Sequence, residues 1–305
     1  MPNFRPDDFH GIHAILYALF GENERLDRAA MRRQVEICLA SGVHGMAALG
    51  LATEVSKLTE AERRTVMDWT AQDTAGKVPL AFTIFGASVA EQIGQVRHAE
   101  SVGADWVILQ PPPVGAYGAP EYISFFGRVA EATDLPVAIQ NAPAFFGRGL
   151  SSDEIRDLTT LHPNVRLIKG EGPVTDIAGL IERTEGRLPV FNGRGGLELI
   201  DNLRIGCRGM ILAPDCIDHA VRAYNAFRAG DEAAAETHYE QMLPAAVFVM
   251  QGIENLICYG KRLFGTRAGI PIHDRAPAMR PNETGLAMVQ RFAASLGSLS
   301  SPFRQ

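Results

Sequence analysis

Residues 164–173 read NVRLIKGEGP, a short apolar run that ends on a lysine and turns at once. Lys169 therefore lies at the end of a predicted buried strand, whereas the other lysines lie in polar or basic segments: Lys57, Lys77 and Lys261. Removal from water disfavours the charged form of an amine, and a neutral amine is a nucleophile for carbonyl carbon. The alternative is a structural lysine whose ammonium group reaches solvent at the strand terminus.

The composition argues against several classes of protein. The chain has 305 residues and a net charge of −6, so it can bury a large core and has no basic excess of the kind that binds nucleic acid. No apolar run is long enough to span a bilayer, and residues 1–8, MPNFRPDD, lack the order of a signal peptide. We therefore expect a cytoplasmic protein with no membrane or nucleic-acid partner.

The cysteines and histidines do not predict a metal site. The cysteines are scattered and form no C-x-x-C pair, which favours free, buried thiols in a cytosolic protein: Cys38, Cys207, Cys216 and Cys258. The histidines have no spacing typical of metal ligands. We expect the protein to work without a metal or a cofactor.

Short apolar runs alternate with helical patterns along most of the chain. Strands are expected at residues 10–18, 44–49, 78–85, 106–110, 136–140, 165–169, 188–192 and 208–212. The helices expected after them cover residues 27–40, 59–74, 88–102, 120–133 and 151–160, a segment ending near 183, and residues 197–205 and 215–228. Thr59 and Ser151 are expected to cap two of these helices.

Eight strand–helix units in about 230 residues match the count and length of an α/β fold, the (β/α)8 TIM barrel. The strands are near-continuous apolar runs, as in a parallel sheet covered on both faces. An open doubly wound sheet fits less well, because no Gly-x-Gly-x-x-Gly follows the first strand. The sequence predicts a barrel over residues 8–230 and a C-terminal helical extension over residues 231–305 packed on it, with helices at 231–264 and 283–296.

In such a barrel the active site forms at the carboxyl ends of the strands. Polar or glycine-rich segments follow four of the predicted strands, at residues 50–54, 140–143, 169–171 and 192–196. Lys169 would then point into the mouth of the barrel, dry on one side and open to a ligand on the other. This placement favours imine formation over exposure of the lysine to solvent.

These segments give the chain a resemblance to the dihydrodipicolinate synthase and N-acetylneuraminate lyase family of lysine-dependent class I aldolases and dehydratases. The resemblance runs from His10 to about Leu296. Residues 50–59, GLATEVSKLT, stand where the family has Gly-Thr-Thr-Gly-Glu and then Leu-Thr, and residues 139–143, IQNAP, where it has Tyr-Asn-x-Pro. Lys169 matches the end of its Schiff-base strand.

The resemblance implies an imine between Lys169 and a 2-oxo acid. The enamine formed from it can add to an aldehyde, be protonated after carbon–carbon cleavage, or expel a β-hydroxyl group, because the protonated imine accepts electrons. The resemblance also implies a small-molecule 2-oxo acid as substrate and a homo-oligomer, either a tetramer or a dimer.

Several family residues are replaced in this chain. The two threonines that help to bind the pyruvate carboxylate and relay protons are Leu51 and Ala52, and the catalytic tyrosine is Gln140. The tyrosine donated across a subunit boundary aligns with Pro113, and the arginine that holds a second carboxylate aligns with Phe145. These losses argue against dihydrodipicolinate synthase or sialate lyase activity.

The motif pattern is closer to that of 2-keto-3-deoxy sugar-acid dehydratases. Enzymes that resemble L-2-keto-3-deoxyarabonate dehydratase carry Gln-Asp-Ala-Pro after strand five and Lys-x-Glu-x-Pro after strand six; this chain has QNAP at residues 140–143 and KGEGP at 169–173. We therefore favour dehydration of a 2-keto-3-deoxy sugar acid. The alternatives are an aldolase for an apolar or aromatic aldehyde, suggested by Phe145 and Phe146, and a non-catalytic 2-oxo acid binding protein.

The predicted catalytic residues are Lys169, Glu171 and Gln140. Glu171 is the candidate acid/base group, and the alternative is a carboxylate that stabilises the start of a helix. Gln140 can orient a hydroxyl group or a water molecule but cannot exchange a proton at neutral pH. The predicted substrate-binding positions are Leu51, Ala52, Thr53, Asn141, Gly193 and Ile211.

Most of these positions have a structural alternative. Residues 51–53 can bind a carboxylate through backbone N–H groups, with the Thr53 hydroxyl added, or form a plain loop. Ile211 matches a family position whose carbonyl faces the substrate, while its side chain belongs to the core. Glu54 is expected to be structural, and Tyr17 either replaces a lost hydroxyl group or packs in the interior.

Overall fold

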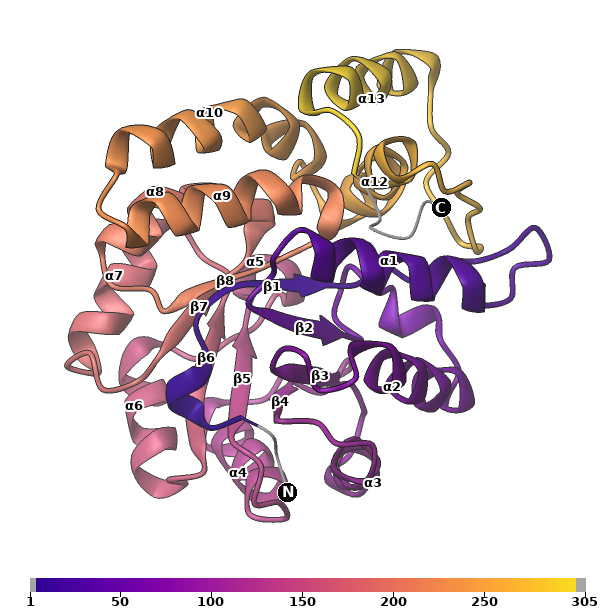
Figure 1. The fold of residues 1–305 in the computed structure, drawn as a ribbon. Coiled ribbons are helices and arrows are strands. Elements are labelled where there is room, and N and C mark those ends of the chain that lie inside the picture. Colours follow the sequence, from indigo (N-terminus) through magenta and orange to yellow (C-terminus); the bar gives the residue numbers. More distant parts are fainter. Residues whose placement is uncertain (1–3, 300–305) are drawn as a thin grey trace.

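Eight parallel strands close into a barrel in the order of the sequence (Figure 1). The computed structural model describes residues 4–299 of the chain. The strands are β1 (Gly11–Ile15), β2 (Gly45–Ala48), β3 (Leu80–Ile84), β4 (Trp106–Leu109), β5 (Val137–Asn141), β6 (Val165–Gly170), β7 (Val190–Asn192) and β8 (Gly209–Leu212). All eight predicted strands are present, so the predicted (β/α)8 architecture is confirmed.

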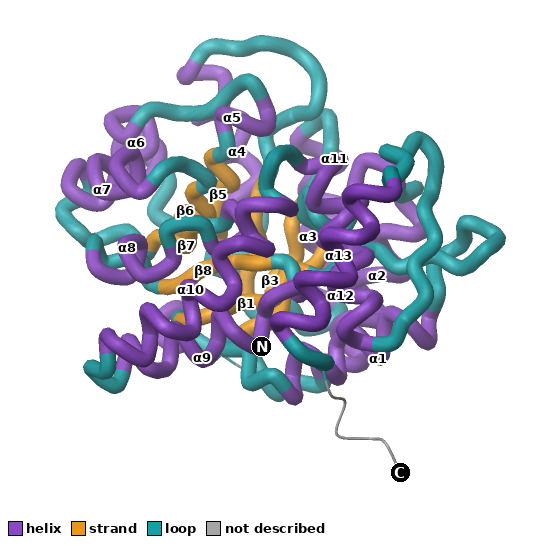
Figure 2. Tube along the Cα trace, turned by 90° about the horizontal axis from the view of Figure 1, so that it is seen from above, coloured by secondary structure: helices purple, strands orange, loops and turns teal. Residues whose placement is uncertain are grey.

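Helices follow the strands and form a ring around the barrel, which is seen from above in Figure 2. The main ones are α1 (Arg28–Ala40), α2 (Glu60–Thr74), α3 (Val89–Ser101), α4 (Ala119–Ala130), α6 (Ser152–Leu161), α7 (Val174–Arg183), α8 (Leu199–Arg204) and α9 (Ile217–Arg228). Short 3-10 segments are η1 (Pro6–Asp8), η2 (Val55–Lys57), η3 (Arg194–Gly196) and η4 (Pro214–Cys216). The short helix α5 (Pro143–Phe146) follows β5 and was not predicted.

Two helix starts show why the local sequence folds as predicted. Thr59 accepts a hydrogen bond from the backbone of Glu62, and the Glu62 carboxylate accepts one from the backbone of Thr59. Ser151 and Glu154 repeat this reciprocal arrangement at the start of α6. Each pair satisfies backbone N–H groups that would otherwise lack a partner, which fixes where the helix begins.

Aromatic rings fill the end of the barrel where the strands begin. The ring centroids of Phe9 and Trp106 lie 5.4 Å apart, and those of His13 and Phe191 lie 5.0 Å apart. Gly45 leaves room for this packing, because a Cβ atom there would lie 2.2 Å from the His13 ring. The filled end leaves the carboxyl ends of the strands as the side on which a ligand can be held, as in other barrels of this type.

The C-terminal segment is helical, as predicted, but its first helix is broken. It comprises α10 (Glu232–Val249), α11 (Ile253–Asn255), the π-helical η5 (Leu256–Gly260), α12 (Lys261–Ala268) and α13 (Glu283–Leu296). The prediction of one helix over residues 231–264 was therefore wrong at residues 250–252, where the backbone of Gly252 is extended with φ 173°. In Figure 1, α10 lies along α8 and α9, while α12 lies near α1 and α13 lies beyond α12.

Over residues 4–299, no single helix has both the length and the apolar character needed to cross a bilayer. Residues Glu232–Val249 and Ile253–Ala268 reach the required length and composition only as a pair, and that pair is bent by 109°.

Candidate active site

Lys169 is the second-last residue of strand β6, and Glu171 lies beside it. The two residues are separated by one position, so the alternation of side chains along a strand places both on the same side. Lys169 is only 3% exposed, and its Nζ atom lies 2.8 Å from Glu171 Oε1. The predicted nucleophile and the predicted acid/base group therefore form a buried ion pair.

Gln140 on the neighbouring strand completes the contact. It is paired in register with Lys169 across β5 and β6, and its Nε2 atom donates a hydrogen bond to Glu171 Oε1 at 3.1 Å. Gln110, directly after β4, donates from its Nε2 atom to Gln140 Oε1 at 2.8 Å. We refer to Gln110, Gln140, Glu171 and Lys169 as the amide–carboxylate chain.

The carboxylate of Glu171 occupies space that a glycine leaves open. A Cβ atom on Gly193 would lie 3.0 Å from Glu171 Oε1 and 3.1 Å from its Cγ atom, which is tight for any larger residue. The backbone N–H of Gly193 is turned to Asn192 Oδ1, to which it donates at 2.7 Å. Gly193 thus borders the Glu171 carboxylate, although its N–H already donates to Asn192.

The turn after β2 contains the predicted carboxylate-binding residues. The N–H of Thr53 donates to the carbonyl of Gly50 at 3.0 Å, and its hydroxyl donates to the carbonyl of Leu16 at 2.5 Å. In contrast, the N–H groups of Leu51 and Ala52 have no hydrogen-bond acceptor among the described residues. These two N–H groups, and not the Thr53 hydroxyl, are available to an anion.

Backbone strain accompanies this turn. Leu49, fully buried at the end of β2, has φ 67°, and Glu54 has φ 55°. Left-handed backbone costs a residue with a Cβ atom about 1–2 kcal/mol. Strain of this kind persists where the surrounding structure imposes it, which is common at functional sites.

Two other predicted binding positions have structural contacts. The side chain of Asn141 accepts from the N–H of Leu150 at 2.8 Å and donates to its carbonyl at 2.9 Å, while the Asn141 carbonyl accepts from the N–H of Glu171 at 3.0 Å. Asn141 therefore ties the segment containing α5 to the strand beside Lys169. Ile211 lies in β8, in register with His13, and is buried.

The Tyr17 hydroxyl group already has a hydrogen-bond partner, Asp215. Its hydroxyl donates to Asp215 Oδ1 at 2.8 Å, and the tyrosine is completely buried. Burial raises the pKa of Tyr17 well above its ordinary value and raises the pKa of Asp215 to about 6. The tyrosine is part of an interior acid–phenol pair.

Lys261, which lies in a basic segment of the sequence, is a second buried lysine, and the sequence analysis did not predict its burial. It is fully buried and pairs with Glu54 Oε1, and it donates to the carbonyl of Ala18 at 3.1 Å. Burial lowers the pKa of Lys261. The other Glu54 oxygen lies 2.6 Å from the Nζ atom of Lys57. Glu54 is thus a structural ion-pair centre, as expected, and Lys261 is fully engaged by it.

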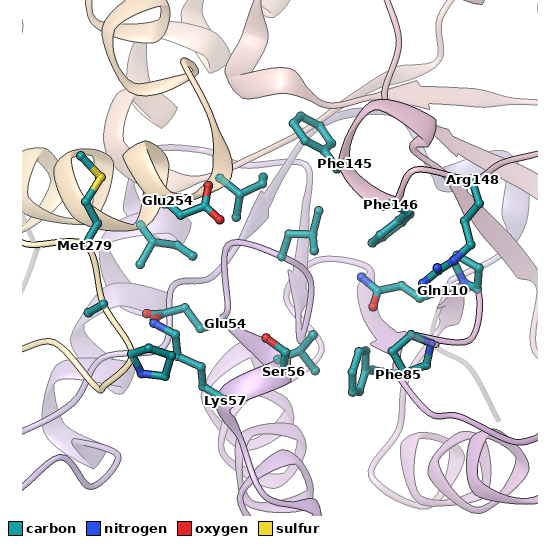
Figure 3. A pocket seen from close by; sticks show the side chains of 18 residues that line it. Glu54, Ser56, Lys57, Phe85, Gln110, Phe145, Phe146, Arg148, Glu254 and Met279 are labelled. Carbon is teal, nitrogen blue, oxygen red and sulfur yellow. The ribbon is translucent and has the colours of Figure 1, made fainter. Parts of the chain in front are cut away.

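A cavity of about 710 Å³ is lined by Gln110 and Glu54, among other residues (Figure 3). Its walls come from the loops after several strands and from the C-terminal segment, including Phe85, Phe145, Phe146, Arg148, Ile253 and Met279. Gln110 is the member of the amide–carboxylate chain that lines it. Gln140, Glu171 and Lys169 do not line the cavity, and Gln110 links it to them through its hydrogen bond to Gln140.

Two residues of the site were missed in the sequence analysis. Gln110 was read only as the end of a strand, although a polar residue at a strand end was the signal used for Gln140 and Lys169. Thr83, inside the apolar strand β3, is fully buried, and its hydroxyl has no hydrogen-bond partner among the described residues. A Cβ atom built on Gly50 would lie 3.6 Å from this hydroxyl, so it borders the turn after β2.

Sequence comparison with known proteins identifies the family to which the chain belongs. A sequence model of the Dihydrodipicolinate synthetase family matches residues 8–271. A 4-hydroxy-tetrahydrodipicolinate synthase from Methanoculleus marisnigri is 30% identical over 239 residues, covering 76% of this chain and 81% of that protein. An Escherichia coli K12 protein named "Probable 2-dehydro-3-deoxy-D-pentonate aldolase YjhH" is 25% identical over 264 residues, covering 84% and 88%.

The fold is also found among solved structures. YagE, a prophage protein of the dihydrodipicolinic acid synthase family from Escherichia coli K12, was solved in complex with pyruvate. It superposes with a TM-score of 0.87 at 24% identity, covering 94% of this chain and 98% of that one. At this identity the likeness establishes the arrangement of the chain.

Proposed function

The chain belongs to the dihydrodipicolinate synthetase family of lyases and aldolases, and on that premise we propose that it dehydrates a 2-keto-3-deoxy sugar acid through an imine on Lys169. The observation that carries the proposal is the contact between Lys169 Nζ and Glu171 Oε1 at 2.8 Å. The contact supports the proposal because Glu171 can move protons and lies beside Lys169 in a site where Gln140 replaces the family tyrosine.

The reaction begins with attack of the Lys169 amine on C2 of the substrate. The carbonyl oxygen leaves as water, and the protonated imine makes the C3 hydrogen acidic. Glu171 takes that proton, and the electron pair forms the C3–C4 double bond as the C4 hydroxyl group departs with a proton returned by Glu171. Hydrolysis of the imine then releases the product and the lysine.

Other groups of the site have supporting roles. Gln140 donates to Glu171 and holds the carboxylate beside the amine, but it transfers no proton itself. The free N–H groups of Leu51 and Ala52 bind the substrate carboxylate. Asn141 fixes the segment after β5, and Gly193 leaves the space that the Glu171 carboxylate needs.

An aldolase reaction with an apolar or aromatic aldehyde is the second candidate. It is favoured by the aromatic walls of the cavity, where Phe85, Phe145 and Phe146 lie around the opening (Figure 3). It would use the same imine on Lys169, but the enamine would attack an aldehyde instead of expelling a hydroxyl group. We also propose, from the family and the sequence, a cytoplasmic homo-oligomer.

The deciding experiment is turnover on a panel of 2-keto-3-deoxy pentonates and hexonates, followed by NMR. Loss of water with no release of pyruvate is the expected result. Release of pyruvate and an aldehyde would support the aldolase instead. Trapping of pyruvate by borohydride without turnover on any member of the panel would leave a 2-oxo acid binding protein and would overturn the enzymatic proposal.

A further inference from the structure

Glu171 determines which atoms donate and which accept in the hydrogen bonds of the amide–carboxylate chain. Glu171 Oε1 is close to both Lys169 Nζ and Gln140 Nε2, and an ionised carboxylate can only accept hydrogen bonds. Gln140 must therefore turn its NH2 group to Glu171, which leaves its carbonyl oxygen for its other neighbour. Gln110 Nε2 donates to that oxygen at 2.8 Å.

The same reasoning fixes what Gln110 presents to a ligand. Since one N–H of its NH2 group donates to Gln140, the amide is oriented with its only side-chain acceptor, the carbonyl oxygen Oε1, turned away from Gln140, and Gln110 lines the cavity (Figure 3). No residue in the described part of the chain donates a hydrogen bond to this oxygen. Gln110 therefore presents an open acceptor, and an open acceptor is matched by a donor on the ligand.

The backbone of Gln110 is held firmly enough to make this acceptor specific. Its N–H donates to the carbonyl of Ile84 at 3.1 Å, and its own carbonyl accepts from the Nε2 atom of the buried Gln92 at 2.9 Å. The Gln110 side chain is only 1% exposed. Because the residue is fixed at both its backbone and its amide nitrogen, it cannot exchange the positions of its amide oxygen and nitrogen without breaking the bond to Gln140.

We propose that Gln110 is a specificity-determining residue that accepts a hydrogen bond from a hydroxyl group of the substrate. This inference rests on the proposed function, because it is imine formation at Lys169 that anchors C2 of a 2-oxo acid below the cavity. The ligand class is a 2-oxo acid with a hydroxyl group beyond C3. A 2-oxo acid without such a group makes the imine but leaves Gln110 Oε1 unpaired.

The test uses two probes that differ only in hydroxyl groups, 4,5-dihydroxy-2-oxopentanoate and 2-oxopentanoate. The half-saturating concentration for borohydride trapping is measured for each probe with the wild type, Gln110→Met and Gln34→Met. Methionine keeps the length of glutamine and removes the acceptor. Gln34 is the matched control, because it is a buried glutamine whose amide bonds only to the backbone of Tyr17 and to Met31.

Gln110→Met is expected to raise the half-saturating concentration for the dihydroxy probe by about 10-fold, the scale of one hydrogen bond between neutral groups. The value for 2-oxopentanoate should change by less than about 2-fold on the same scale, and Gln34→Met should leave the ratio of the two probes unchanged. Equal changes for both probes, or no change for either, would overturn the assignment.

Misfolding of the Gln110 variant and failure of the proposed function are distinguished by separate measurements. If circular dichroism shows that Gln110→Met does not fold, Gln110→Asn is judged by the same criterion, since it keeps the amide but withdraws the oxygen by one methylene. Failure of the wild type to trap pyruvate would overturn the proposed function, and this inference with it, whereas normal trapping of pyruvate with no preference between the probes would overturn only the role of Gln110.

Discussion

Glu171 is held against Lys169 from two sides, because its Oε1 atom lies 2.8 Å from Lys169 Nζ and accepts a hydrogen bond from Gln140 Nε2 at 3.1 Å. Both side chains are buried, so the attraction between them is screened less than on the surface. A carboxylate in this position can receive the proton that the ammonium group must lose before it attacks a carbonyl.

Lys169→Ala should abolish the adduct that forms when the protein is reduced with borohydride in the presence of pyruvate. Mass spectrometry of the wild-type protein should place the adduct on the peptide containing Lys169. Lys57→Ala is the control, because Lys57 lines the same cavity and should leave the adduct intact. An adduct on Lys261, or one that survives in Lys169→Ala, would show that another lysine is the nucleophile.

Glu171→Gln should keep the pyruvate adduct but lower turnover on a 2-keto-3-deoxy acid by about 10²–10⁴-fold, the usual contribution of general acid–base catalysis. The amide retains the shape of the side chain and can still contact Gln140, but it cannot act as an acid or a base at neutral pH. The measurement is kcat together with the yield of borohydride trapping. Glu198→Gln serves as the control, because Glu198 pairs with Arg194 and not with Lys169.

Two results would contradict the role of Glu171. Normal turnover of Glu171→Gln would mean that another group or a water molecule moves the proton. Loss of trapping in the same variant would mean that Glu171 acts in imine formation or in folding, and a thermal melt separates these two cases.

Tyr17→Phe should leave turnover within a few-fold of the wild type, because the Tyr17 hydroxyl is occupied by Asp215 and is fully buried. The variant should instead be less stable by about 1–3 kcal/mol, the cost of leaving a buried partner without its hydrogen bond. Urea unfolding and kcat, measured on the same sample, test both parts. A loss of turnover of 10²-fold or more in a stable variant would identify Tyr17 as the missing proton carrier.

The fold was predictable because it rests on local patterns. The alternation of apolar strands and amphipathic helices identifies all eight units, and the capping boxes at Thr59 and Ser151 mark two helix starts. The break near Gly252 was missed, because the apolar pattern continues across it from α10 to α12. The extended backbone of a single glycine decides the break, and periodicity does not report it.

The site was predictable only where its residues lie at strand ends. Lys169, Glu171 and Gln140 come together because β5 and β6 are neighbours and the alternation along each strand sets their direction. The pairing of Glu54 with Lys261 spans 207 positions in sequence, and no local pattern predicts such a contact. No local pattern predicts either that the Thr53 hydroxyl donates a hydrogen bond to the carbonyl of Leu16.

Condensation of pyruvate with aspartate semialdehyde should stay near background. The hydroxyl relay of the synthases is replaced by Leu51, Ala52 and Gln140, and Phe145 stands where an arginine would hold the second carboxylate. The assay is the coupled reduction of the condensation product. A turnover number typical of enzymes, about 10 per second, would show that this site performs the synthase reaction without the relay.

The last prediction concerns acid stability and His13, which is completely buried inside the barrel. Burial lowers the pKa of His13 from 6.5 to about 3, and the histidine is held neutral against the carbonyl of His10. The unfolded chain therefore binds one more proton than the folded chain between pH 6.5 and about 3. The free energy of unfolding should fall as the pH drops through this window.

The size of the effect follows from the width of the window. At about 1.36 kcal/mol per pH unit, His13 alone accounts for a loss of roughly 5 kcal/mol between pH 6.5 and 3. His10, His44 and His219 act in the same direction, because burial lowers the pKa of each. Asp215 acts in the opposite direction between pH 3.8 and about 6, because burial raises its pKa.

The measurement is urea unfolding of the wild type and His13→Gln at pH 7.5, 6.5, 5.5 and 4.5. Glutamine is neutral throughout, so the variant should lose less stability than the wild type as the pH falls, even if it is less stable at pH 7.5. The difference between the two proteins should narrow by about 2–3 kcal/mol between pH 6.5 and 4.5, which is two pH units at the rate given above. Parallel curves for the two proteins would show that His13 does not titrate differently in the folded and unfolded states.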